Sequence, residues 1–467
     1  MYGMGLKDIV QEFLRFKSGL FGLFLLFIIV GMAVGAPVIS SEEAGYRWYD
    51  IEYWTGLDLP KGVPPEWVGL LTGTSYSPSE RYVIEPERNR YGFYEFNITY
   101  NYEYDVPPTN IIIRIEGNIT KRYLLTIDVI RPDGYVIERV IDRQTNNPNY
   151  RLSVKADDGA RSRILSFAKT FETEENINTV FGGGLEKVVN IIKILFLKAE
   201  EGIMLEKSPI LNGEYIFRFT IYTTDPQDTI DKVTFIVNGA SYGVFGTDAL
   251  GRDIFVGIVW GARVALVLGL IVAIVSVLIG VVYGTVSAYV GGWTDEILQR
   301  IQEFVISIPL LPLLLILAYT FQPTIWNLIL LLIVFSWPGP VKTIRSMALQ
   351  IREQLYITAA KAIGASTSRI VLRYILPQIL PYTFALVAFS VPGAILTEAG
   401  VSFLLGAQGT LEITWGRILS DAERYSAVLT GMWWWVIPPG IMIAISGLAF
   451  VFIGTALDRV LNPRLLR

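Results

Sequence analysis

Apolar runs without a charged residue recur along the chain and predict membrane-spanning helices. A helix that crosses the hydrocarbon core of a bilayer needs about 20 largely apolar residues, since lipid offers the backbone no hydrogen-bond partners. The run at 304–341 is 38 residues long and is interrupted by Gln322-Pro323, so we expect two helices with a tight turn between them. Six membrane-spanning helices are therefore predicted, from runs at 18–41, 264–294, 304–341, 374–397 and 425–457.

The segment between the first two apolar runs has the periodicity of strands. Apolar and polar residues alternate at 122–130 and at 135–141, and the turn residues Arg131-Pro132-Asp133-Gly134 lie between them. This pattern is typical of a β-hairpin. Strand-like patterns also occur elsewhere in the segment, and one stretch has helical spacing. We therefore predict a β-sandwich, with further strands at 91–104, 110–116, 213–223 and 231–237 and a helix at 185–197.

The distribution of charge separates the same two parts. Of the 467 residues 52% are apolar and only 18% are charged, compared with about 25% charged in an average soluble domain. Residues 37–245 hold 52 of the 82 charged residues, 22 basic and 30 acidic. The predicted fold class is therefore an all-α polytopic membrane protein with six transmembrane helices and a β-rich, sandwich-like extracellular domain inserted between helices 1 and 2.

Lysine and arginine collect in one loop, which sets the expected orientation. Residues 341–381 carry six bases against one acid, so we expect this loop in the cytoplasm, with both termini inside and 40–245 outside. A cleaved signal peptide ending near Ala33-Val34-Gly35-Ala36 is the alternative for the first run. The expected domains are a cytoplasmic N-terminus at 1–17, helix 1 at 18–39, the extracellular domain at 40–245, and a core at 246–467 with its cytoplasmic loop around 342–378.

Composition excludes several classes of function. The chain has no cysteine and no histidine, which removes disulfides, thiolate or imidazole metal ligands, and catalytic triads with an imidazole base. The net charge of −4 does not fit a basic nucleic-acid-binding surface. No Gly-Lys dipeptide occurs, so there is no phosphate-binding loop of the G-x-x-x-x-G-K-[ST] type. If the protein pumps a solute, another chain must hydrolyse the nucleotide.

The cytoplasmic loop contains a short predicted helix of small residues that ends at Gly364. Such a helix can fit into a groove of another protein. The loop resembles the E-A-A-x3-G-x9-I-x-L-P coupling loop of binding-protein-dependent ABC importer permeases. Thr358 stands where the family has glutamate, and Tyr374 stands at the isoleucine position. The residues that the resemblance assigns to ATPase coupling are Tyr356, Ala359, Ala360, Lys361, Gly364, Ala365, Leu376 and Pro377.

Further motifs occur in the order of the C-type permease of the dipeptide, oligopeptide and nickel importer family. The segment 246–253 resembles its G-T-D-x-x-G-R-D entry to the second helix, and 289–295 is similar to Y-x-G-G-x-x-D. The segment 398–404 resembles E-A-x-L-S-F-L, and Trp415-Gly416, Pro439-Gly440 and Asn462-Pro463-Arg464 follow. The resemblance covers about half of the chain and not the outer insertion. The entry-motif residues are Gly246, Thr247, Asp248, Gly251, Arg252 and Asp253.

The resemblance implies a permease subunit of an importer of peptides or related oligomeric solutes, without an ATPase site of its own. It implies a heterodimer with a second permease subunit, two cytoplasmic ATP-binding subunits that hydrolyse ATP, and an extracellular solute-binding protein, all at the cell membrane. No cofactor, metal or nucleic acid is expected on this chain. Peptides, oligosaccharides and metal chelates remain open as substrates. The outer domain could dock the binding protein, cover the pore or brace the partner permease, and we expect a docking or scaffold role.

Two other classes of function remain as alternatives. An ion-coupled secondary carrier normally places ionisable groups inside its helices, and here only Glu398 borders a predicted span. It is either a functional intramembrane acid or an interfacial group paired with a neighbouring helix or with the outer Arg252 or Arg263. A membrane-anchored receptor would explain the outer domain but not the further spans. Asn97 and Asn118 begin glycosylation triplets whose use the sequence leaves open.

Overall fold

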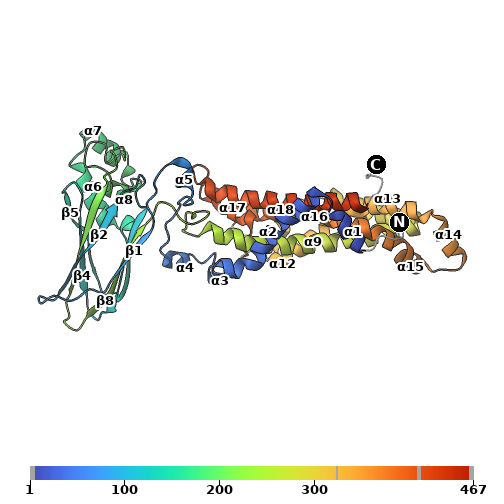
Figure 1. Cartoon of the computed structure of the whole chain (residues 1–467), viewed down its shortest axis with the longest axis horizontal. Coiled ribbons are helices and arrows are strands. Elements are labelled where there is room, and N and C mark those ends of the chain that lie inside the picture. Colours follow the sequence, from blue (N-terminus) through green and yellow to red (C-terminus); the bar gives the residue numbers. More distant parts are fainter. Residues whose placement is uncertain (1–5, 322–323, 407–411, 462–467) are drawn as a thin grey trace. The chain divides into compact units, whose positions relative to one another are not determined.

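The computed structural model describes residues 6–321, 324–406 and 412–461, and the chain divides into two compact units. We call Asp50–Ile254 the sandwich unit, and Met1–Tyr49 with Phe255–Arg467 the helical unit. Figure 1 labels most of the helices and several strands of the two units. The predicted turn at Gln322-Pro323 and the end of the chain from 462 lie outside the described residues.

The helices and strands of the described chain occur in the following order. The sandwich unit holds α4 (Ile51–Gly56), α5 (Val68–Thr72), β1 (Glu80–Ile84), β2 (Phe93–Tyr102), β3 (Asn110–Asn118), β4 (Tyr123–Ile130), β5 (Val136–Thr145), β6 (Asn149–Ser153), α6 (Asp158–Lys169), α7 (Glu174–Ile177), α8 (Ile191–Leu195), β7 (Gly213–Thr223) and β8 (Thr229–Asn238). The helical unit holds α1 (Leu6–Phe13), α2 (Lys17–Ile39), α3 (Glu42–Tyr46), α9 (Ile254–Val290), α10 (Gly292–Ser307), α11 (Leu310–Thr320), α12 (Ile325–Ser336), α13 (Pro338–Arg352), α14 (Leu355–Ala362), α15 (Thr367–Ile370), α16 (Leu376–Leu405), α17 (Trp415–Arg424) and α18 (Trp433–Leu461), with α9 beginning at the boundary.

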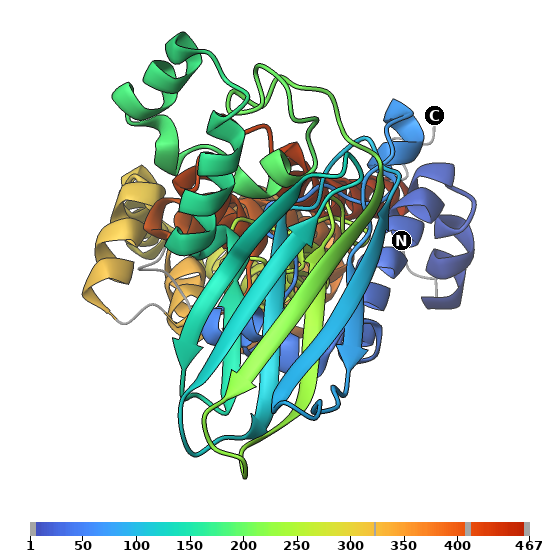
Figure 2. The same ribbon diagram turned by 90° about the vertical axis from the view of Figure 1, so that its left-hand side faces the viewer.

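The sandwich unit consists of two four-stranded antiparallel sheets, in the orders β1-β8-β3-β6 and β2-β7-β4-β5. Figure 2 looks onto these strands, with α6 and α7 gathered at one end of them. Six of the strands lie where the sequence predicted strands. β1 and β6 were not predicted, and each is five residues long. A β-rich domain is therefore confirmed, and its extracellular placement remains a prediction.

The core of the sandwich forms because alternate strand residues point inward. Ile127 of β4 pairs with Phe219 of β7, and Ile113 of β3 pairs with Phe235 of β8; all four side chains are buried in one cluster. The helix predicted at 185–197 is wrong in its length, since α8 covers only its last part. The Asn190 side chain accepts hydrogen bonds from the backbone N–H groups at 192 and 193, so it starts a new helix instead of continuing one.

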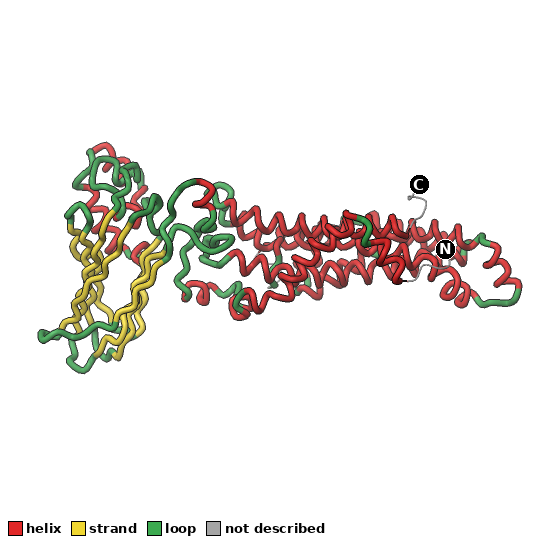
Figure 3. Tube along the Cα trace, viewed as in Figure 1, coloured by secondary structure: helices red, strands yellow, loops and turns green. Residues whose placement is uncertain are grey.

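The helical unit contains five helices long and apolar enough to cross a membrane, or six if the bent pair α10–α11 counts as one span. Figure 3 shows these helices side by side. The bend between α10 and α11 is 75° and falls at Ile308-Pro309, a break the sequence analysis did not predict. From Ile325 to Arg352, α12 and α13 together form one candidate span. The protein is thus a multi-pass membrane protein whose described residues provide five or six spans.

Glycines allow the helices of this unit to approach closely. A Cβ atom on Gly280 of α9 would lie 2.5 Å from Pro340 Cγ, and one on Gly284 would lie 2.8 Å from the Val341 carbonyl oxygen, both on α13. On α2, a Cβ on Gly22 would lie 2.8 Å from a backbone carbonyl oxygen of α18. Small residues at such contacts are typical of helix packing in membranes, where lipid removes the hydrophobic drive for association.

Candidate functional site

The helix predicted in the cytoplasmic loop is α14, and its end has the geometry of a Schellman motif. Gly364 has φ +84°, a left-handed conformation that favours glycine. The Gly364 N–H donates to the Lys361 carbonyl oxygen at 3.0 Å, and the Ala365 N–H donates to the Ala360 carbonyl oxygen at 3.0 Å. The helix therefore stops sharply at the glycine, as the sequence predicted.

One face of α14 is anchored in the helical unit. Ile357 and Ala360 are buried in a cluster with residues of α9, α13 and the start of α16. The Tyr356 hydroxyl accepts a hydrogen bond from the side-chain amide of Gln378, which also donates to the Tyr374 carbonyl oxygen at 2.9 Å. The predicted residues Leu376 and Pro377 form the first turn of α16, where a proline costs no hydrogen bond.

The opposite face of α14 is open. Leu355 and Ile363, at its two ends, are 87% and 84% exposed, and Thr358, Ala359 and Lys361 are exposed between them. A partner that covered Leu355 and Ile363 would remove their apolar surface from water. The predicted coupling residues therefore divide into a buried anchor and an exposed face.

The turn between α9 and α10 contacts α14, which the sequence analysis did not predict. Gly291 and Gly292 both have positive φ, of 70° and 58°, and reverse the chain there. Lys361 Nζ lies 5.0 Å from the centroid of the Tyr289 ring, a cation–π contact. The Y-x-G-G-x-x-D motif supplied the signal for a special turn, but only the fold shows which part of the loop it contacts.

The acidic residue of the same motif joins α10 to α13. Asp295 accepts two hydrogen bonds from the Arg345 guanidinium, one of them from Nε at 2.8 Å. The Ser287 hydroxyl of α9 also donates to this carboxylate. One side chain therefore connects α9, α10 and α13.

The predicted entry motif forms a buried loop of the sandwich unit, directly before α9. Asp248 accepts hydrogen bonds from the backbone N–H groups of Leu250, at 2.9 Å, and Arg252, at 2.8 Å, and forms an ion pair with the Arg252 guanidinium. Burial raises the pKa of the Asp248 carboxyl, while Arg252 acts in the opposite direction. An aspartate that caps its own loop in this way holds the chain in one conformation.

The other residues of the entry motif complete the same loop. The Thr247 side chain is buried and accepts a hydrogen bond from the Val63 N–H at 3.3 Å. Thr247 and Asp253 form an isolated antiparallel bridge, and Gly246 and Gly251 have positive φ. These contacts give the motif a structural role in the chain that leads into α9.

Glu398 is buried in α16 and is held by hydroxyl groups. The Ser402 hydroxyl donates to its Oε1 at 2.6 Å, and the Thr414 side chain is also hydrogen-bonded to it. Within the described part of the helical unit Glu398 has no arginine partner, so the pairing with Arg263 is wrong. No group of three or more acidic side chains in the described chain could hold a metal ion.

The contacts around Glu398 bring together two sequence motifs that are separated along the chain, the segment 398–404 and Trp415-Gly416. A Cβ atom on Gly416 would overlap the Ala399 carbonyl oxygen, so α17 lies directly against α16. Trp415 Nε1 donates to the Ile258 carbonyl oxygen of α9 at 3.0 Å. These contacts position the segment that precedes α17 against both α16 and α9.

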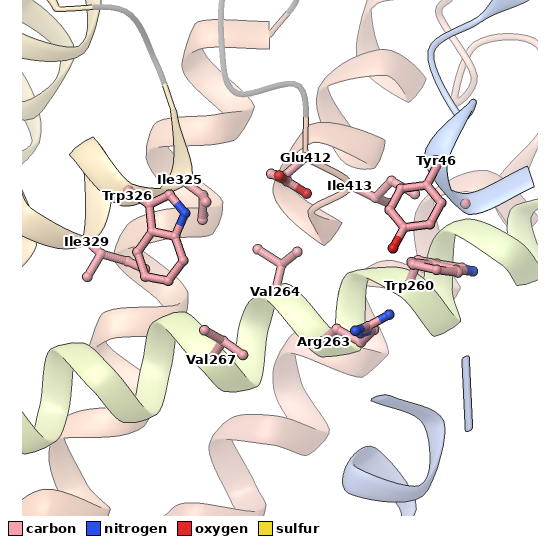
Figure 4. Close-up of a pocket in the computed structure, with 11 residues that line it drawn as sticks. Tyr46, Trp260, Arg263, Val264, Val267, Ile325, Trp326, Ile329, Glu412 and Ile413 are labelled. Atoms are coloured by element: carbon pink, nitrogen blue, oxygen red, sulfur yellow. The ribbon is translucent and has the colours of Figure 1, made fainter. Parts of the chain in front are cut away.

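A groove of about 430 Å³ lies beside this segment, within the helical unit (Figure 4). Its walls carry three aromatic side chains, one cation and one acid, and its floor is aliphatic. The groove was not predictable from the sequence, because its residues come from four separate segments. They are Gly45, Tyr46, Trp260, Arg263, Val264, Val267, Ile325, Trp326, Ile329, Glu412 and Ile413.

Comparison with known proteins gives a consistent set of similarities. Residues 276–467 match the family model described as binding-protein-dependent transport system inner membrane component. The dipeptide transport system permease protein DppC of Bacillus subtilis is 36% identical over 224 residues, which are 48% of this chain and 69% of that protein. The oligopeptide transport system permease protein OppC of Haemophilus influenzae is 34% identical over 48% of this chain and 71% of that protein.

Among solved structures, a chain of the MetNI methionine ABC transporter in inward-facing conformations is similar to this chain. The match covers 44% of this chain and 95% of that chain, with 19% identity and a TM-score of 0.34. This TM-score is too low to support a statement about the fold.

Proposed function

The chain belongs to the family of binding-protein-dependent transport system inner membrane components, and on that premise we propose that it is one permease subunit of an ATP-driven importer of peptides or related oligomeric solutes. In this proposal it forms half of the translocation path with a second permease subunit. Two cytoplasmic ATP-binding subunits supply the energy, and an extracellular solute-binding protein delivers the solute. The names of the similar proteins, which are dipeptide and oligopeptide permeases, support peptides as the solute class.

The observation that carries the proposal is the two-sided surface of α14. Ile357 and Ala360 anchor it, while Leu355 and Ile363 are exposed at its ends. An ATPase groove that covers these two side chains would bury apolar area, at about 25 cal/mol per Å². The family resemblance assigns ATPase coupling to the same helix.

The contacts behind α14 support transmission of movement into the membrane helices. Lys361 contacts Tyr289 at the end of α9, and Asp295 of α10 pairs with Arg345 of α13. A displacement of α14 by the ATPases would therefore be passed on to α9 and α13. The result is a shift between inward-open and outward-open arrangements, driven by the different affinities of nucleotide and delivered solute for the two states.

The proposed orientation places α14 and both termini in the cytoplasm and the sandwich unit outside. Basic residues around α14 support this, because positive loops stay on the cytoplasmic side. Docking of the solute-binding protein is the proposed role of the sandwich unit.

The test is co-purification of the ATPases together with ATP-dependent peptide uptake in membrane vesicles. Ile363→Asp places a charge in the proposed contact and should release the ATPases and abolish uptake while the subunit stays in the membrane. Leu70→Asp is the matched control for ATPase co-purification, since Leu70 is 87% exposed, close to the 84% of Ile363, but lies in the sandwich unit. Retention of ATPases and normal uptake by Ile363→Asp would contradict the assignment of α14.

A further inference from the structure

Arg263 carries an exposed positive charge into the groove from α9 (Figure 4). Its guanidinium carbon lies 5.1 Å from the centroid of the Trp260 ring, and among the described residues it has no carboxylate partner. A guanidinium can donate two parallel hydrogen bonds to a carboxylate. The geometry therefore leaves this cation available to an anionic group of a ligand.

Aromatic side chains beside Arg263 offer apolar surface. Tyr46 and Trp326 are 72% and 64% exposed, and the Tyr46 ring lies 5.4 Å from the Trp260 ring. The floor between them is formed by residues 264 and 267, both valines. Aromatic side chains that become buried contribute large contact areas, so this part of the groove suits the apolar body of a ligand.

Glu412 supplies the opposite charge, and Figure 4 shows it across the groove from Arg263. Contacts of the next residues hold Glu412 in this position. The Thr414 side chain is hydrogen-bonded to Glu398, and Trp415 donates a hydrogen bond to the backbone of α9. The Glu412 carbonyl oxygen also accepts a hydrogen bond from the Tyr49 hydroxyl at 3.4 Å. The groove thus has a positive wall, a negative wall and an apolar floor.

We infer that the groove binds a short zwitterionic peptide. Arg263 binds the peptide carboxylate and Glu412 binds the peptide ammonium group. The aromatic side chains of the groove contact the apolar side chains of the peptide. The volume of about 430 Å³ is in the range of small-ligand sites. This inference rests on the proposed function and deepens it, because it assigns recognition of the peptide termini to residues of this chain.

The experiment measures binding of the dipeptide Leu-Leu to the full chain in phosphatidylcholine nanodiscs. Arg263→Gln should weaken binding by about tenfold or more, the loss of a charged hydrogen-bond pair. It should not change binding of the C-terminal amide of Leu-Leu, and Arg263→Lys should restore part of the affinity. Arg300→Gln is the control, because Arg300 is an exposed arginine of α10 that does not line the groove.

Equal binding of Leu-Leu by the wild type and Arg263→Gln would overturn the inference. So would displacement of Leu-Leu by phosphatidylglycerol in the nanodisc, which would identify a lipid phosphate as the occupant. ATP-dependent uptake in vesicles separates the two proposals. Binding without uptake contradicts the proposed function, whereas uptake that Arg263→Gln leaves unchanged contradicts only the role of this groove.

Discussion

The sandwich unit buries charged side chains in networks, whereas the helical unit packs through glycines. Asp58, whose side chain is fully buried, pairs with both Arg114 and Arg151. Arg131, also fully buried, pairs with Asp133 and donates to backbone carbonyl oxygens in and just after the last turn of α8. Each of these buried charges has partners, because a buried charge without a partner is costly in free energy.

The helical unit has contacts of another kind. Gly280, Gly284 and Gly416 mark places where a single added carbon would meet the next helix. In lipid, association of helices depends on such close van der Waals contact because apolar side chains gain little by leaving the solvent. The two kinds of packing can be tested by removing volume from the aromatic core of the sandwich unit and by adding volume at a glycine contact of the helical unit.

Phe196→Ala should give the largest effect and should be confined to the sandwich unit. Phe196 is fully buried, with its ring centroid 4.7 Å from that of Tyr215 and 4.8 Å from that of Tyr102. Removing the ring should lower the free energy of unfolding by about 3–5 kcal/mol. Hydrogen exchange of the full chain should accelerate in β2, β4 and β7 but not in α16 or α18. Tyr91→Ala, at an exposed position, is the control, and equal loss of protection in both units would contradict their separation.

Gly416→Ala should give the next largest effect, in the helical unit. The added methyl group overlaps the Ala399 backbone, so α17 must move away from α16, at a cost of about 1–3 kcal/mol. Thermal unfolding in detergent measures the loss. Gly440→Ala is the matched control, because its added carbon meets no atom within 4 Å. If the two variants behave alike, close approach at Gly416 does not matter.

Gly364→Ala should have a smaller effect, because alanine at this position would strain the backbone but would not clash with a neighbour. A Cβ atom there meets nothing within 4 Å, but φ is +84°, which costs about 1–2 kcal/mol for an L-residue. The end of α14 should fray, and peptide uptake in vesicles should fall. Gly339→Ala, also without a neighbour within 4 Å, should leave uptake unchanged. Equal uptake by the two variants would show that the end of α14 does not contribute to transport.

Lys361→Met should have the smallest effect. It removes the cation–π contact with Tyr289, worth about 0.5–1 kcal/mol at an exposed site, and keeps most of the length of the side chain. The expected result is more ATP hydrolysed per peptide transported, in vesicles that contain the whole transporter. An unchanged ratio would show that this contact does not contribute to coupling.

Much of the architecture could be predicted because it depends on local periodicity. The strands β2, β4 and β7 and the apolar helices follow from repeated apolar spacing. β1 and β6 were missed because they are short and are held by pairing with strands distant in sequence, such as Glu80 with Val237. The Schellman end of α14 was predictable from Gly364, whereas the contact of Lys361 with Tyr289 was not.

By itself the sequence determined which segments are apolar enough to enter a membrane, which alternate as strands, and which motifs match a permease, since each of these depends on residues close along the chain. Tertiary structure alone decided that Glu398 meets Thr414 and that Arg263 and Glu412 line one groove. The reason is physical: such contacts depend on the packing of helices that are far apart in sequence, and no local pattern encodes that packing.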